Sequence, residues 1–155
     1  YLCPNKLAYI MRKILFIVLI TLVCLPMMAQ TPKNNVDTTS FKGYLYNKEY
    51  NVYLQIDFYH QNVIVPRQEV YGEMAGYFGD CQDARKWLFT SATIKNDHLA
   101  EIEIINDYGS EDLKATLTKV NDSTFVLRQG EGSTIKIARN RKWQKMPKEL
   151  TFIKR

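Results

Sequence analysis

Apolar and polar side chains alternate one by one along most of the chain after residue 41, and this constrains the fold more than any other feature. In YNVYLQIDF, residues 50–58, every second side chain is apolar and those between are mostly polar. A period of two places one set of side chains on the core face of a strand and the other on the opposite face. The alternation recurs in AEIEI, DLKATLTK, STFVLRQ, STIKIAR and LTFIK. The chain is therefore predicted to consist of β-strands.

Short polar breaks rich in Asn, Asp and Gly separate the alternating segments. They fall at residues 47–49, 60–62, 66–68, 96–97, 121–122 and 129–132. These residue types accept the backbone geometry of tight turns. About ten strands at this spacing indicate an antiparallel meander in a single β domain, residues 41–155. Such a sheet buries its apolar face by closing into a small barrel or by splitting into a sandwich, and the local pattern leaves both open.

The chain before this domain carries the pattern of a secretory signal. MRK at residues 11–13 precedes the apolar run ILFIVLITLVCL, and the chain turns polar after Pro26. A basic start, a short apolar stretch and a small residue at the exit predict a signal peptide over residues 11–29, cleaved after Ala29. The apolar run is shorter than the roughly 20 residues of a membrane span. We therefore expect an exported protein, periplasmic or extracellular, with no stable membrane span after cleavage.

Three further expectations concern the flanks of the signal. Residues 1–10 are interpreted as upstream sequence read through before Met11, and residues 30–40 as a polar, flexible leader. Cys24 lacks the preceding leucine and small residue of a lipobox, so lipoprotein anchoring is not expected there. Cys81 is the only cysteine after the predicted cleavage. The domain therefore has no intramolecular disulfide and must rely on its apolar core.

Charge is unevenly distributed along the chain. The formal net charge is +5, but part of this excess belongs to the first thirteen residues. Lysines and arginines dominate residues 136–155, where Glu149 is the only acid. Such a segment suits an anionic lipid, a glycan or a nucleic acid, or it forms an ordinary solvated strand face. Since an exported protein rarely meets nucleic acid, no nucleic-acid partner is expected.

The acidic segment NDYGSEDL, residues 106–113, is open to three interpretations: a cation site, a pair of catalytic acids or a turn between two strands. Asp107, Glu111 and Asp112 are weak candidates for binding a cation such as calcium, which prefers several oxygen ligands. Their spacing does not match the twelve-residue calcium loop. Asn106 and Gly109 suit a tight turn between two strands. We expect the turn, with no metal ion and no cofactor.

Glycines interrupt the aromatic segment VYGEMAGYFGD, residues 70–80. Glycine inside a strand marks a bend, a bulge or close approach by other atoms. Gly72 and Gly76 therefore predict either a bend that helps a barrel to close or a place where a ligand meets bare backbone. In the following GDCQDARKW, residues 79–87, the pattern allows one short helical turn capped by Asp80.

Aromatic residues supply the remaining candidates for a binding surface. Tyr44, Tyr46, Tyr53 and Tyr59 are predicted on the face opposite the first core stripe. There they form either an exposed tyrosine patch, a common feature of binding surfaces, or the cover of a second core. Trp87 is open to the same two interpretations, as is the second tryptophan of the chain.

The chain as a whole resembles small exported all-β proteins of Gram-negative bacteria. The segments that carry the resemblance are MRKILFIVLITLVCLPMMAQ, YGEMAGYFGD and KWQKMPKELTFIKR. In size and strand count the chain is also similar to lipocalin-like proteins. No motif is specific to one family.

These features predict a non-enzymatic binding or envelope-associated domain. Its partner would be a small apolar ligand or an envelope protein, bound in a concave apolar cavity or on an aromatic sheet face. One alternative is a hydrolase of envelope glycan or peptide that uses Asp57, Asp80 or Glu73. A second is an inhibitory or structural partner protein. The sequence contains no nucleophile elbow, zinc motif or cofactor fingerprint, but a site assembled from distant strands stays open.

Overall fold

A computed structural model describes residues 39–155 of the chain. The predicted upstream segment, the signal peptide, most of the leader and Cys24 lie outside the described residues. The described residues belong to one compact unit. Within residues 39–155, no helix is long and apolar enough to cross a membrane.

The described residues form strands, connected by turns and one short 3-10 helix, η1. In chain order the elements are β1 (Lys42–Asn47), β2 (Val52–Asp57), β3 (Val63–Ile64), η1 (Glu69–Tyr71), β4 (Glu73–Met74), β5 (Gly76–Asp80), β6 (Lys86–Asn96), β7 (Leu99–Asn106), β8 (Asp112–Lys119), β9 (Thr124–Gly132), β10 (Lys136–Arg139), β11 (Lys142–Lys145) and β12 (Glu149–Lys154).

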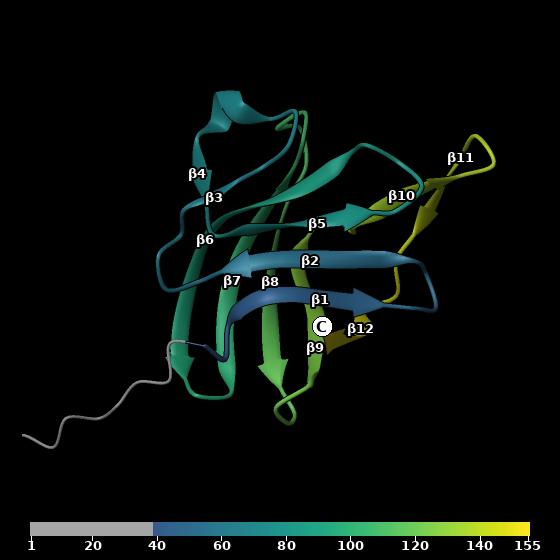
Figure 1. The fold of residues 1–155 in the computed structure, drawn as a ribbon. Helices are drawn as coiled ribbons and strands as arrows, with labels where there is room; N and C mark the ends of the chain where they lie inside the picture. Colours follow the sequence, from purple (N-terminus) through teal and green to yellow (C-terminus); the bar gives the residue numbers. More distant parts are fainter. Residues whose placement is uncertain (1–38) are drawn as a thin grey trace, which may run out of the picture. The chain divides into compact units, whose positions relative to one another are not determined.

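Eight of these strands close into an antiparallel barrel in the order β1-β12-β9-β8-β7-β6-β5-β2 (Figure 1). Each barrel strand pairs with the barrel strands before and after it in the chain, and pairing of β1 with β12 completes the ring. The other four strands form two hairpins, β3–β4 between β2 and β5, and β10–β11 between β9 and β12. The predicted all-β meander is confirmed, and the closed ring makes it a barrel.

Side chains of the barrel strands fill its interior. A barrel of eight strands is just wide enough to be filled by side chains or to hold one small ligand. Here five fully buried phenylalanines occupy it, namely Phe41, Phe78, Phe89, Phe125 and Phe152. The predicted alternation is also confirmed, since the inward residues of β2, β7, β8, β9 and β12 are buried and most of the side chains between them reach solvent.

A second, smaller apolar cluster lies outside the barrel wall, beneath the β3–β4 hairpin. Val65 and Met74 of this insertion pack against Tyr77 of β5 and Leu88 of β6, all four buried. This cluster explains why β5 and the start of β6 are buried on both faces. The insertion therefore shields one side of the barrel from solvent.

The predicted helical turn at residues 79–87 is wrong. Asp80 ends β5, and its carboxylate accepts a hydrogen bond from the backbone N–H of Gln82 at 3.0 Å. Asp83 in turn accepts one from the backbone N–H of Arg85 at 2.9 Å. Aspartates bonded to the backbone two residues on favour turns over helix. The short helical turn lies at η1 instead.

The predicted hairpin turn at residues 129–132 is also wrong, because this segment continues β9. Its glycines serve the pairing with β8 rather than a reversal of the chain. Gly132 has a φ of +102°, and a Cβ there would lie 2.5 Å from the backbone oxygen of Asp112. The β8–β9 register shifts at this point, between Leu113 and Ala115. The glycines therefore mark an irregularity in the pairing of β8 with β9, not a chain reversal.

Candidate functional site

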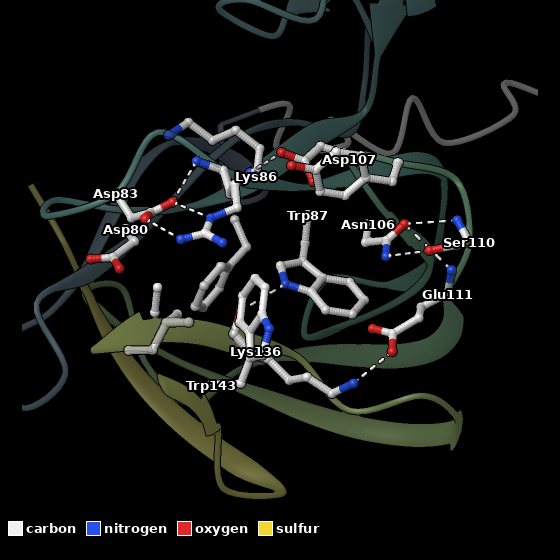
Figure 2. A pocket seen from close by; sticks show the side chains of 15 residues that line it. Asp80, Asp83, Lys86, Trp87, Asn106, Asp107, Ser110, Glu111, Lys136 and Trp143 are labelled. Carbon is white, nitrogen blue, oxygen red and sulfur yellow. Dashed lines mark hydrogen bonds and ion pairs between the residues drawn. The ribbon is translucent and has the colours of Figure 1, made fainter. Parts of the chain in front are cut away.

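A pocket of about 240 Å³ opens where the β5–β6 connection, the β7–β8 turn and the β10–β11 hairpin meet (Figure 2). Its lining combines aromatic rings with charged and amide side chains from these three segments. The sequence had singled out several of the lining residues for separate reasons, among them Asp80, Trp87, Asp107, Glu111 and Trp143. The fold brings them together at one site.

Two tryptophans give the pocket its aromatic surface. Trp87 on β6 is 6% exposed, and its indole Nε1 donates a hydrogen bond to the backbone oxygen of Lys136 at 3.1 Å. Trp143 on β11 is 57% exposed and forms part of the opposite wall. The guanidinium of Arg85 lies 4.4 Å from the centre of the Trp143 ring, within cation–π range. Trp87 is therefore fixed in place, whereas Trp143 offers ring surface to solvent.

The pocket carboxylates Asp83 and Glu111 each form an ion pair with a nearby cation. Asp83 forms a two-pronged ion pair with Arg85, with N···O distances of 2.7 and 2.6 Å. The side-chain hydrogen bonds from Arg85 lower the pKa of Asp83 to about 2. Glu111 on the β7–β8 turn pairs with Lys136 on β10 at 2.6 Å. Both carboxylates are thus held in place by an ion pair.

Asp80 and Arg139 attach the β10–β11 hairpin to the barrel. Both guanidinium nitrogens of Arg139 donate to the Asp80 carboxylate, one of them at 3.0 Å. Arg139 also donates to the backbone oxygen of Tyr50 at 2.8 Å. The hydrogen bond to Asp80 raises the pKa of Arg139. Asp80, which is almost fully buried, therefore has a structural partner and is not a free acid.

The acidic segment between β7 and β8 forms a turn organised by Asn106. The Asn106 side-chain oxygen accepts the backbone N–H of Ser110 at 2.9 Å, and Gly109 has a φ of +66°. Asp107 accepts the backbone N–H of Lys86 at 3.2 Å. Asp112 starts β8 outside the pocket lining. Within residues 39–155 no group of His, Cys, Asp and Glu gathers that could hold a metal ion.

Two of the predicted tyrosines lie together on the outer wall, away from the pocket. Tyr44 stacks on Tyr53 with 5.1 Å between ring centres, and Tyr53 meets Tyr77 edge-on at 5.9 Å. Burial raises the pKa of both Tyr53 and Tyr77. A Cβ at Gly79 would lie 2.4 Å from the Tyr53 ring, so the glycine admits this ring and not a ligand.

The other predicted binding residues are dispersed. Tyr46 donates to the side-chain oxygen of Asn51 at 2.8 Å and stacks under the Arg155 guanidinium. Tyr59 packs against the main core, on the opposite side of the wall from the face predicted for it. Gly72 ends η1, where a Cβ would meet open space, whereas a Cβ at Gly76 would strike the β2 backbone.

Asp57 and Asp80, two of the acids proposed for a hydrolase, do not meet. Asp80 pairs with Val52 at the start of β2, whereas Asp57 ends that strand, about 17 Å further along. Burial alone would raise the pKa of Asp57, but hydrogen bonds from Lys42 and His60 outweigh it and lower the pKa to about 2. Glu73 is exposed on the β3–β4 insertion. A pair of glycosidase carboxylates lies roughly 5 to 10 Å apart, so Asp57 and Asp80 do not form one.

Comparison of the chain with family models, curated proteins and solved structures found no match. Sequence reasoning missed the roles of Lys136 and Arg139, whose partners Glu111 and Asp80 lie on other segments, and the cation–π contact of Arg85 with Trp143. For Arg85, only the ion pair with Asp83, two residues earlier, could have been inferred from the local sequence.

Proposed function

We propose that this protein is an exported, non-enzymatic binding domain whose barrel-end pocket takes one small polar ring, such as a sugar unit of an envelope glycan. The observation that carries the proposal is the pairing of an exposed indole, Trp143, with polar groups held in fixed positions around the same cavity. The signal-like sequence supports the exported location.

The chemistry of the pocket matches a sugar ring. A pyranose has an apolar C–H face that packs on an aromatic ring and hydroxyls that both donate and accept hydrogen bonds. The pocket offers acceptors on Asp107 and Glu111, a donor on Lys136 and an amide on Asn106. Ligand sites typically combine apolar walls with a few positioned polar groups. The volume of about 240 Å³ admits a single ring rather than a long chain.

Two observations favour this site over an apolar ligand inside the barrel or a catalytic role. The interior is filled by phenylalanines, so an apolar ligand there would have to displace core side chains. In the pocket, Asp83 and Glu111 are each held in an ion pair, with Arg85 and with Lys136. Acid–base catalysis needs two carboxyl groups in environments that push their pKa values apart, whereas both of these groups are engaged by a cation. The eight-strand meander, shared with lipocalin-like barrels, supports binding by analogy alone.

Titration with simple sugars tests the proposal. Residues 36–155 contain the whole ring of strands and its core, so this segment is suitable if circular dichroism confirms that it folds. N-acetylglucosamine and glucose are the probes, followed by amide NMR shifts. We expect shifts around Trp87, Asn106 and Lys136, and about a tenfold loss of affinity on Trp143→Ala.

Tyr46→Ala is the matched control, since it removes a ring that also stacks on an arginine but lies outside the pocket. The control should bind like the unchanged protein. Absence of shifts with either sugar, or equal losses in the two variants, would contradict the proposed site.

A further inference from the structure

The β10–β11 hairpin carries an unusual density of positive charge. Four of its residues in the strands are cationic, and Arg141 adds another in the turn. The register places like charges directly opposite each other in two of four cross-strand pairs, Lys136 with Lys145 and Arg139 with Lys142. Like charges in opposite positions destabilise a sheet. The hairpin therefore favours an external source of negative charge.

The barrel compensates only one member of each pair. Lys136 is paired with Glu111 and Arg139 with Asp80. Within residues 39–155, Arg141, Lys142 and Lys145 have no acidic side chain within ion-pair distance. All three are exposed. They form the uncompensated part of the hairpin's charge, which we call the cationic tip.

Arg141 and Lys142 of the cationic tip lie at the turn end of the hairpin, whereas Lys145 lies opposite Lys136 at its base. The hairpin extends beyond the strands that carry it (Figure 1), and every residue of β11 is exposed. Trp143 lies between Lys142 and Lys145 on the same strand and is 57% exposed. A projecting tip of this kind suits a broad charged surface better than a single strand of polymer, which needs a groove.

We propose that the cationic tip docks this protein onto the anionic phospholipid surface of a membrane. Basic residues are attracted to anionic headgroups, and tryptophan is the side chain that prefers the boundary between headgroups and acyl chains. The cationic tip supplies the basic residues, namely Arg141, Lys142 and Lys145, and the exposed Trp143 supplies the tryptophan. Binding is peripheral, through a few charges, and weakens as salt screens them.

Vesicle sedimentation tests the docking, with residues 36–155 and vesicles of phosphatidylcholine alone or mixed with phosphatidylglycerol. We expect binding to the mixed vesicles only, reduced by added salt. Each cation contributes roughly fivefold in partitioning, so the triple variant R141Q, K142Q and K145Q should lose about a hundredfold. Because Trp87 is buried and Trp143 is exposed, a blue shift of the intrinsic fluorescence on mixed vesicles reports the hairpin.

A charge-matched variant separates the cationic tip from net charge. Lys95→Gln, Lys114→Gln and Arg128→Gln remove the same charge from exposed positions on the barrel strands and should retain vesicle binding. Equal loss in both triple variants, or binding to sulfated polysaccharide but not to mixed vesicles, overturns the proposal. The tip variant retains every pocket residue, so its sugar titration stays unchanged if the proposed sugar site exists, whatever the vesicles show.

Discussion

Gly79 shows how a single residue decides the packing of the outer wall. It lies between Tyr53 on β2 and Lys86 on β6, its partners in neighbouring strands. The Tyr53 ring covers the bare backbone of Gly79, and the Lys86 ammonium lies 5.8 Å from the centre of that ring. A side chain at position 79 would push the Tyr53 ring away from the Gly79 backbone and from the Lys86 ammonium.

Gly79→Ala should therefore lower the free energy of unfolding by about 1–3 kcal/mol, the usual range for overpacking. Urea denaturation followed by circular dichroism measures the change. In a Tyr53→Ala background the same substitution should cost much less, because the ring that it strikes is gone. Equal losses in the two backgrounds would show that Gly79 serves another purpose.

Gln129 connects the β10–β11 hairpin to the barrel at the scale of elements. Its buried amide donates to the backbone oxygen of Pro147 at 2.7 Å, and its oxygen accepts the backbone N–H of Ile135, also at 2.7 Å. One side chain on β9 thus holds the residues just before and just after the hairpin. The Asp80–Arg139 pair holds its middle.

Gln129→Ala should lower stability by about 2–3 kcal/mol, because it leaves buried backbone groups without partners. Hydrogen exchange at the Ile135 amide should accelerate more than exchange in the barrel strands. Gln144→Ala, at an exposed position of β11, is the control and should change neither quantity. If Gln129→Ala leaves the exchange of Ile135 unchanged, the side chain does not hold the hairpin.

The alternation of side chains predicted the strands and their core faces because it is a local property of the chain. Pairing of β1 with β12 could not be predicted, since it joins the two ends of the domain. The candidate site, too, was predictable where it depends on local sequence and not where it depends on long-range contacts. Trp87, Asp107 and Glu111 were nominated from local chemistry, but Glu111 meets Lys136 across 25 residues and Asp80 meets Arg139 across 59. Such ion pairs are created by the fold.

At the scale of the whole molecule, acid should weaken the barrel through carboxylates in two separate regions. Asp57 ends β2, and Asp83 lies in the β5–β6 connection near the other end of that strand. Both have a pKa of about 2 in the folded protein, below the ordinary value of 3.8. The stability that they contribute is complete above about pH 4 and is lost as the pH falls towards 2.

We therefore expect Asp57 and Asp83 to leave the urea midpoint unchanged from neutral pH to about pH 4 and to lower it at more acidic pH. Asp57→Asn should destabilise the protein at neutral pH by about 1–3 kcal/mol, because the charged hydrogen bonds from Lys42 and His60 are lost. The difference between the two proteins should shrink as the pH approaches 2. A difference that stays constant across this range would mean that the charge of Asp57 is unimportant.

Because β1 pairs with β12, the ring of strands is closed, and the chain could begin at a different strand without changing the barrel. Leu45 lies opposite Lys154, so the start of β1 is only about 10 Å along the strand from the end of β12. A linker of a few residues would join them, and the barrel could then be opened at any tight turn, such as the one between β6 and β7. A circularly permuted chain opened at this turn would retain every hydrogen-bonded ladder of the ring, and its termini would lie on the same rim as the present ones.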